Sequence, residues 1–258
     1  MKEVILMWKN TRMIVLVAIT SSIFASILIP FKGIQLIPGI TEIRPASIIP
    51  VVFGLLFGPA GAWGSCFGNI IGDIFGTFSL GSFFGAIGNF YFALVSYKLW
   101  ENLPFFNSEV TPDIKRKADL TKFFIVSIVA SMTVAFIIAW GLEILRLTPF
   151  AVLAPIITIN NSLSNVFIGP ILLKILYPRL ERWGLLWREV MEIPFKKKKT
   201  LGSFLILIGV LGGWVSGILI STQVYQARLF SFGSGETSLS LVLNLLPFLA
   251  IFLIGSIL

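Results

Sequence analysis

Two polar side chains lie four residues apart in an apolar stretch of the sequence. Asn69 and Asp73 belong to a run from Ala60 to Phe78 that holds no other charged residue. Residues four apart share one face of a helix, and a carboxylate within a membrane span requires a partner or a function. The pattern fits either an interhelical hydrogen bond that only stabilises the bundle or a contact with a bound substrate.

Other polar side chains could complete a binding site around Asp73. Arg44 is predicted at the outer end of a short apolar run, as a partner of Asp73, a contact for a substrate anion or an interfacial anchor. Asn89 adds an amide, and a cluster further along adds amides and hydroxyls from Asn160, Asn161, Ser162, Ser164 and Asn165. Amides both donate and accept hydrogen bonds, which suits a neutral heteroaromatic or polar small molecule.

Trp140, Tyr91 and Glu143 could add an aromatic face and one more acceptor to this site. The alternatives are packing or interfacial positions for the two aromatic residues and a surface ion pair between Glu143 and Arg146. The predicted substrate-binding residues are Arg44, Asn69, Asp73, Asn89, Trp140, Glu143, Asn160, Asn161 and Asn165.

The residues that most enzymes and metal sites use are scarce in this chain. It has no histidine, and its one cysteine, Cys66, lies in an apolar run and is predicted to be a packing residue. Neither an H-E-x-x-H nor a G-x-x-x-x-G-K-[ST] segment is present. We therefore predict no enzymatic activity, no metal site and no cofactor, and any ATP-driven transport would need an ATPase from another chain.

Composition places the chain in a membrane. Of its 258 residues 56% are hydrophobic and only 12% are charged, and the mean hydropathy is +0.94. Too few charged side chains are present to cover a water-soluble surface. The net charge of +8 is typical of cytoplasmic loops that flank membrane spans, and no basic face with base-contacting aromatics suggests nucleic-acid binding.

The hydropathy pattern predicts an all-α, polytopic transmembrane bundle of about eight helices. The second run is short, is interrupted by Pro50 and ends at Gly58-Pro59. The predicted spans are Met13 to Phe31, Ala46 to Phe57, Ala60 to Phe78, Ser82 to Trp100, Phe123 to Leu145, Phe150 to Leu176, Leu201 to Gln223 and Leu239 to Leu258.

Lys and Arg residues give the predicted orientation. With a cytoplasmic N-terminus, sixteen of them fall on the inside and only Lys32, Arg44, Arg146 and Arg228 fall outside. This asymmetry predicts that both termini are cytoplasmic, and therefore an even number of spans, in a cell-membrane protein.

The lysine cluster at 196–199 follows Pro194 and precedes a new apolar run. We therefore predict a six-helix domain over residues 1–180, a basic cytoplasmic linker over 181–200 and two additional transmembrane helices over 201–258. The cluster is predicted to be a solvated stop signal, with binding of anionic lipid head groups as the alternative.

Three segments resemble the substrate-binding S component of energy-coupling factor (ECF) transporters, the importers that pair a small membrane receptor with a shared ATPase module. The segments are RPASIIP from Arg44 to Pro50, GLLFGP from Gly54 to Pro59, and GNIIGD from Gly68 to Asp73. Together with an apolar first helix and a six-helix length, the resemblance covers roughly the first 180 residues.

This resemblance implies a ligand pocket that opens outward and is capped by the loop from Lys32 to Arg44. It also implies a first helix whose small residues dock on the transmembrane coupling subunit, and the nearest match here is Ala18 and Ser22. The implied function is capture of a vitamin-like small molecule for import, with ECF coupling and ATPase subunits and the lipid bilayer as partners.

The last 60 or so residues depart from this resemblance, because a six-helix S component does not require them. The main alternative function is a stand-alone secondary transporter of a small polar solute. A third alternative is a membrane scaffold without a ligand.

Overall fold

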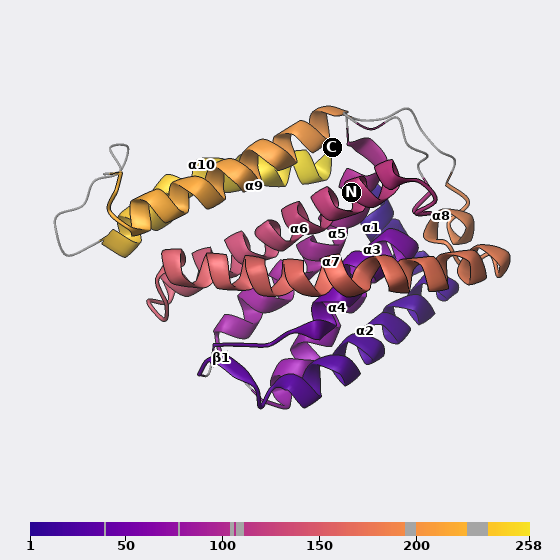
Figure 1. Cartoon of the computed structure of the whole chain (residues 1–258), viewed down its shortest axis with the longest axis horizontal. Coiled ribbons are helices and arrows are strands. Elements are labelled where there is room, and N and C mark those ends of the chain that lie inside the picture. The colour runs from indigo at the N-terminus through magenta and orange to yellow at the C-terminus, as the bar shows by residue number, and fades with distance from the viewer. Residues whose placement is uncertain (39, 77, 104–105, 107–110, 194–199, 226–236) are drawn as a thin grey trace.

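The structure is a computed structural model. It describes the chain except for residues 39, 77, 104–105, 107–110, 194–199 and 226–236. The described part is an all-α helical bundle, as the hydropathy pattern predicts (Figure 1). Its helices are α1 (Lys2–Leu6), α2 (Thr11–Phe31), α3 (Ile48–Phe57), α4 (Pro59–Ile74), α5 (Gly81–Asn102), α6 (Lys117–Ile144), α7 (Phe150–Arg182), α8 (Trp187–Val190), α9 (Thr200–Ser221) and α10 (Thr237–Ile257), with short 3-10 turns η1 (Met7–Lys9) and η2 (Pro45–Ser47).

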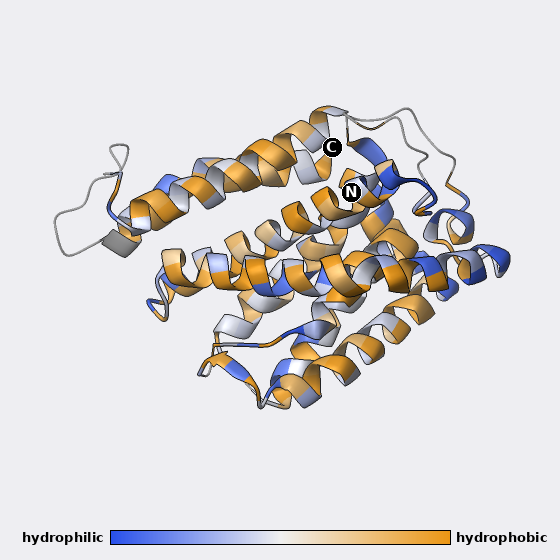
Figure 2. Ribbon diagram, in the orientation of Figure 1, coloured by the Kyte–Doolittle hydropathy of each residue, from blue (hydrophilic) through white to orange (hydrophobic). Residues whose placement is uncertain are grey.

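Five helical segments in the described part of the chain are long and apolar enough to cross a membrane. They are Thr11–Phe31, Lys117–Ile144, Phe150–Val190, Thr200–Ser221 and Leu239–Ile257. The chain is therefore a multi-pass membrane protein, and apolar residues dominate the long helices in Figure 2.

The other three predicted spans correspond to α3, α4 and α5. The short helix α3 is buried along its whole length, and it packs against α2, α4, α5 and α7. A ten-residue helix is tolerated at membrane depth when neighbouring protein, rather than lipid, surrounds it.

Glycines let the inner helices approach closely. A Cβ atom on Gly54 of α3 would lie 2.6 Å from the carbonyl oxygen of Ala93 in α5. A Cβ atom on Gly64 of α4 would lie 2.4 Å from the side chain of Thr20 in α2. Without a side chain at these positions, the helix backbones can approach closely.

The connection between α2 and α3 contains a small hairpin. Strands β1 (Gln35–Ile37) and β2 (Thr41–Glu42) pair antiparallel. The hairpin lies at the end of the bundle where α2 and α4 end and where α5 and α7 begin (Figure 1).

The two chain ends meet at the opposite end of the bundle (Figure 1). Lys98 of α5 is buried and donates through Nζ to the carbonyl oxygen of Ser256, 2.5 Å away. The amino group of Met1 donates to the carbonyl oxygen of Ile257 at 3.3 Å. Helices α9 and α10 pack on each other and against α5 and α6, so they are fixed to the bundle.

Candidate functional site

Asp73 lies near the C-terminal end of α4 and is buried. The ammonium group of Lys32, the residue that follows α2, lies 2.6 Å from Asp73 Oδ1. Asn69 Nδ2 donates to the other carboxylate oxygen, Oδ2, at 2.9 Å. The predicted helix face with Asn69 and Asp73 is therefore present, but the cationic partner of Asp73 is Lys32 and not Arg44.

Glu42 brings a second carboxylate to the same place from strand β2. Its Oε1 atom lies 3.3 Å from Lys32 Nζ and 3.5 Å from Arg44 Nε. Glu42 is only 2% exposed. Two cations, Lys32 and Arg44, thus balance two anions, Glu42 and Asp73, in a site that carries no net charge.

Asn69 lies at the centre of this network. Its Oδ1 atom accepts from Arg44 Nη2 at 2.8 Å and from Asn89 Nδ2 at 3.0 Å. Asn89 also donates to the carbonyl oxygen of Gly85, one turn earlier in α5, at 2.8 Å. Because a Cβ atom on Gly85 would lie 2.9 Å from Asn69 Nδ2, glycine at this position is what leaves room for the amide.

The amides of α7 hold the backbone of the segment that covers the network. Asn160 Nδ2 donates to the carbonyl oxygen of Glu42 at 2.8 Å, and Asn165 Nδ2 donates to that of Ser47 at 3.2 Å. Ser164 Oγ donates to the carbonyl oxygen of Arg44 at 3.3 Å. These side chains therefore fix the hairpin and the start of α3 against α7.

A cavity of about 60 Å³ lies within this network. Its polar lining comprises Lys32, Thr41, Glu42, Arg44, Asn69, Asp73, Ser79 and Ser82, and apolar side chains of α6 and α7 close it. A pocket for a drug-sized ligand has a volume of about 300 to 1,000 Å³. The cavity is therefore too small in this structure for a heteroaromatic ligand.

Several predicted site residues have other contacts. Trp140 Nε1 donates to the carbonyl oxygen of Val242 in α10, at 3.2 Å. Glu143 Oε2 accepts from the backbone N–H of Phe150 at 2.6 Å, so it caps the N-terminus of α7 and is buried, not exposed beside Arg146. Neither Trp140 nor Glu143 lines the cavity.

Asn161 and Tyr91 also lie away from the cavity lining. The Oδ1 atom of Asn161 is buried and has no hydrogen-bond donor in the described part of the chain. The ring of Tyr91 packs against Phe252 of α10, with 5.1 Å between ring centroids. Tyr91 therefore belongs to the contact between α5 and the C-terminal helices.

Lys32 and Glu42 are not among the site residues predicted from the sequence. The pattern places both in the outer loop, where a charged residue is ordinarily solvated. The one available signal was that this loop contains Lys32, Glu42 and Arg44, three charged residues close to a carboxylate that needs a partner.

The sequence profile of the QueT transporter family matches residues 14–178. The chain belongs to the QueT transporter family. The match identifies it as an S component of the ECF transporter class, as the resemblance of its motifs implied. This region contains every residue of the cavity lining and ends before α9 and α10. No curated protein and no solved structure matches the chain.

Proposed function

We propose that this QueT family member captures a queuosine precursor outside the cell and releases it inward when docked on an ECF coupling subunit and its ATPases. The observation that carries the proposal is the buried, charge-balanced network of Lys32, Glu42, Arg44 and Asp73, which joins the hairpin to α2 and α4. A site without net charge favours a ligand that is neutral or carries balanced charges.

The network offers the hydrogen-bonding groups that a polar heterocycle needs. Asp73 accepts, Arg44 and Lys32 donate, and the amides of Asn69 and Asn89 do both. A bound heterocycle would replace the contacts that these groups now make with one another. Because buried polar groups left unpaired are costly, the site would reject analogues that lack the matching groups.

Ligand access is proposed to proceed by displacement of the hairpin. Opening it breaks the contact of Lys32 with Glu42 and the hydrogen bond from Asn160 to the Glu42 carbonyl oxygen. The Lys32 pair with Asp73 need not break, because both residues lie on the helix side of the cavity. In the proposed orientation, with both termini cytoplasmic, the hairpin faces outward.

The docking surface for the coupling subunit is proposed to be the outer face of α2. Ala18 and Ser22 are exposed there, one turn apart, beside the exposed side chains of Ile19 and Ile23. Small residues on a membrane-exposed helix face allow another helix to approach closely. We assign residues 1–180 to the ligand-binding domain, 181–200 to a basic cytoplasmic linker and 201–258 to two additional transmembrane helices.

Mass spectrometry of small molecules extracted from the gently purified chain tests the ligand. A queuosine precursor is expected in the extract, and it should be absent from a parallel preparation of Asp73→Leu. Uptake into vesicles tests the energy source. It should require added coupling and ATPase subunits together with ATP. Uptake by the chain alone, driven by an ion gradient, would instead support a secondary transporter.

A further inference from the structure

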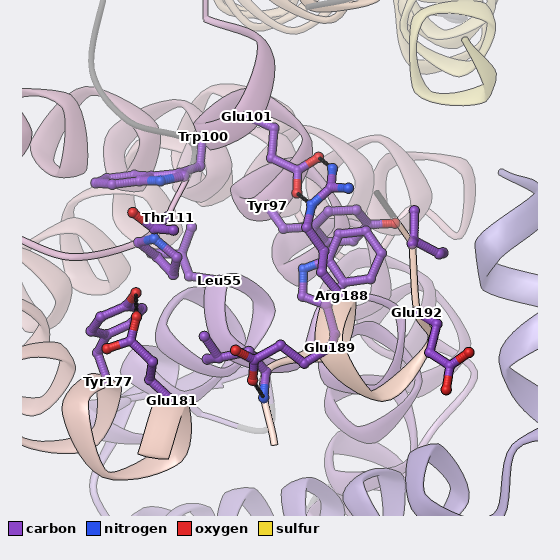
Figure 3. Close-up of a pocket in the computed structure, with 14 residues that line it drawn as sticks. Leu55, Tyr97, Trp100, Glu101, Thr111, Tyr177, Glu181, Arg188, Glu189 and Glu192 are labelled. Atoms are coloured by element: carbon purple, nitrogen blue, oxygen red, sulfur yellow. Dashed lines mark hydrogen bonds and ion pairs between the residues drawn. The ribbon is translucent and has the colours of Figure 1, made fainter. Parts of the chain in front are cut away.

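A second and larger cavity lies at the other end of the bundle (Figure 3). Its volume is about 390 Å³. It is bounded by Leu55 near the end of α3, Trp100 near the end of α5, Tyr177 near the end of α7 and Trp187 of α8. The cavity around Asp73 lies where α5 and α7 begin. The two cavities are therefore separated by the length of these helices.

Aromatic side chains form the inner wall of this second cavity. Tyr97, Trp100, Tyr177 and Trp187 all line it and are all buried. The rings of Tyr97 and Trp187 lie 5.4 Å apart between centroids. Lys122 lies over the ring of Trp100, 4.4 Å from its centroid, but is not part of the lining.

The position of Trp187 depends on a glycine. Gly58 has a φ of +51°, and a Cβ atom there would lie 2.7 Å from the indole ring of Trp187. The sharp turn between α3 and α4 therefore provides the surface on which this ring rests. The aromatic wall is thus part of the packed fold.

Carboxylates form the outer rim. Glu181, Glu189 and Glu192 line the cavity and are exposed. The fourth lining carboxylate, Glu101, is paired with Arg188, whose Nε atom lies 2.7 Å from Glu101 Oε1. Arg188 balances the charge of Glu101, so the other three carboxylates give the rim a negative charge.

Two of the rim carboxylates keep unused hydrogen-bonding capacity. Glu181 accepts from the hydroxyl of Tyr177, and Glu189 accepts from the backbone N–H of Leu186 at 3.3 Å. A carboxylate has about four acceptor positions, so one such bond leaves room for a ligand donor. Figure 3 shows Glu181, Glu189 and Glu192 along one side of the cavity, across from Trp100.

We propose that this cavity binds a small, flat aromatic compound that carries an amidine or protonated amino group. Aromatic side chains attract both a flat ring and a cation, and the rim carboxylates pair with the cation. The volume lies within the range of small-molecule pockets, about 300 to 1,000 Å³. Phosphates and carboxylates are disfavoured, because the rim would repel them. The site is separate from the one proposed for the transported ligand.

Benzamidine is the probe for this site, and benzoate is its matched anionic control because it has nearly the same shape. Each is titrated into the full-length chain in detergent, with tryptophan fluorescence or calorimetry as the readout. Benzamidine should bind about tenfold or more tightly than benzoate, a difference of about 1.4 kcal/mol. Equal binding of the two compounds, or no binding of benzamidine, would overturn the proposal.

Two variants locate the site. Glu181→Gln with Glu189→Gln should weaken benzamidine binding about fivefold or more, which is roughly 1 kcal/mol. Asp73→Asn, at the other end of the bundle, should leave it unchanged. If the double variant does not fold, Glu192→Gln serves in its place, since this side chain is exposed. Benzamidine binding that depends on Asp73 but not on the rim carboxylates would refute the assignment.

Discussion

The ammonium group of Lys32 lies 2.6 Å from Asp73 Oδ1, between two side chains that are only 7% and 10% exposed. Lys32 follows α2, and Asp73 lies near the end of α4. The same ammonium group also lies 3.3 Å from Glu42 of the hairpin. One lysine therefore connects two helices to the segment that covers the cavity.

Removing the cation should destabilise the protein. Lys32→Met leaves the carboxylate of Asp73 buried without its cationic partner, and breaking a buried ion pair in this way costs about 3 to 5 kcal/mol. The free energy of unfolding in detergent should fall accordingly. The double variant Lys32→Met with Asp73→Asn should lose less than Lys32→Met alone, because no unpaired charge remains. Lys117→Met, at an exposed position, is the control and should be neutral. If Lys117→Met destabilised the protein as much as Lys32→Met, loss of the Lys32–Asp73 ion pair would not explain the destabilisation.

Asp73 should be needed for ligand binding as well as for stability. Asp73→Asn keeps the shape and part of the hydrogen bonding, whereas Asp73→Leu removes both. Affinity for the transported ligand should fall in both variants, and more in Asp73→Leu. Trp140→Phe is the matched control, since Trp140 lies outside the cavity lining and donates to the backbone of α10. Normal binding by folded Asp73→Leu would show that Asp73 has only a structural role.

The helices could be predicted from the sequence because each depends on local patterns. The predicted span from Leu201 differs by one residue from the observed start of α9 at Thr200. The shared face of Asn69 and Asp73 follows directly from the helical period. The hydrogen bond from Asn69 Nδ2 to Asp73 Oδ2, at 2.9 Å, agrees with this predicted shared face.

The partners of these side chains could not be predicted in the same way. Lys32 and Asp73 lie 41 residues apart, and they meet because α2 and α4 pack side by side and end at the same end of the bundle. Glu143 caps α7 because a tight turn brings Phe150 back to it. Trp140 is covered by α10, a helix that the family match does not include. Each contact depends on tertiary packing rather than on spacing.

The close approach of α3 and α5 gives a prediction about stability alone. Gly54→Ala places a methyl group 2.6 Å from the carbonyl oxygen of Ala93. Backbone atoms of two packed helices cannot move aside easily, so the free energy of unfolding should fall by about 1 to 3 kcal/mol. Gly33→Ala is the control, because no atom lies within 4 Å of the added methyl group. An unchanged free energy of unfolding in Gly54→Ala would mean that α3 and α5 can move apart at little cost.

The outer face of α2 should determine assembly with the coupling subunit. Ala18→Leu with Ser22→Leu adds bulk where close helix approach is proposed, so copurification of the ECF coupling and ATPase subunits should be lost. Ligand binding should persist, because neither residue lines the cavity. Val15→Leu with Ile19→Leu changes the same exposed face but keeps both small residues, and it should assemble normally. Unchanged assembly of the first variant would exclude this face as the docking surface.

The proposed orientation predicts which ends of the helices are reachable from outside. Leu80, before α5, is 77% exposed at the end that holds the hairpin, and Trp183, after α7, is 68% exposed at the other end. Because Cys66 is the one cysteine, Cys66→Ala gives a background without thiols. In intact cells a membrane-impermeant maleimide should label Leu80→Cys, whereas Trp183→Cys should react only after permeabilisation.

The reverse labelling pattern would place the hairpin in the cytoplasm. The cavity around Asp73 would then lie on the wrong side for capture of an external ligand, and the import function would fail with it. Labelling of both thiols in intact cells would mean that the maleimide had entered the cells. Leu153→Cys in the same background reports reaction at buried positions and should stay unlabelled, because Leu153 is buried. The distribution of Lys and Arg favours labelling of Leu80→Cys from outside, because the hairpin end of the bundle carries few Lys and Arg residues.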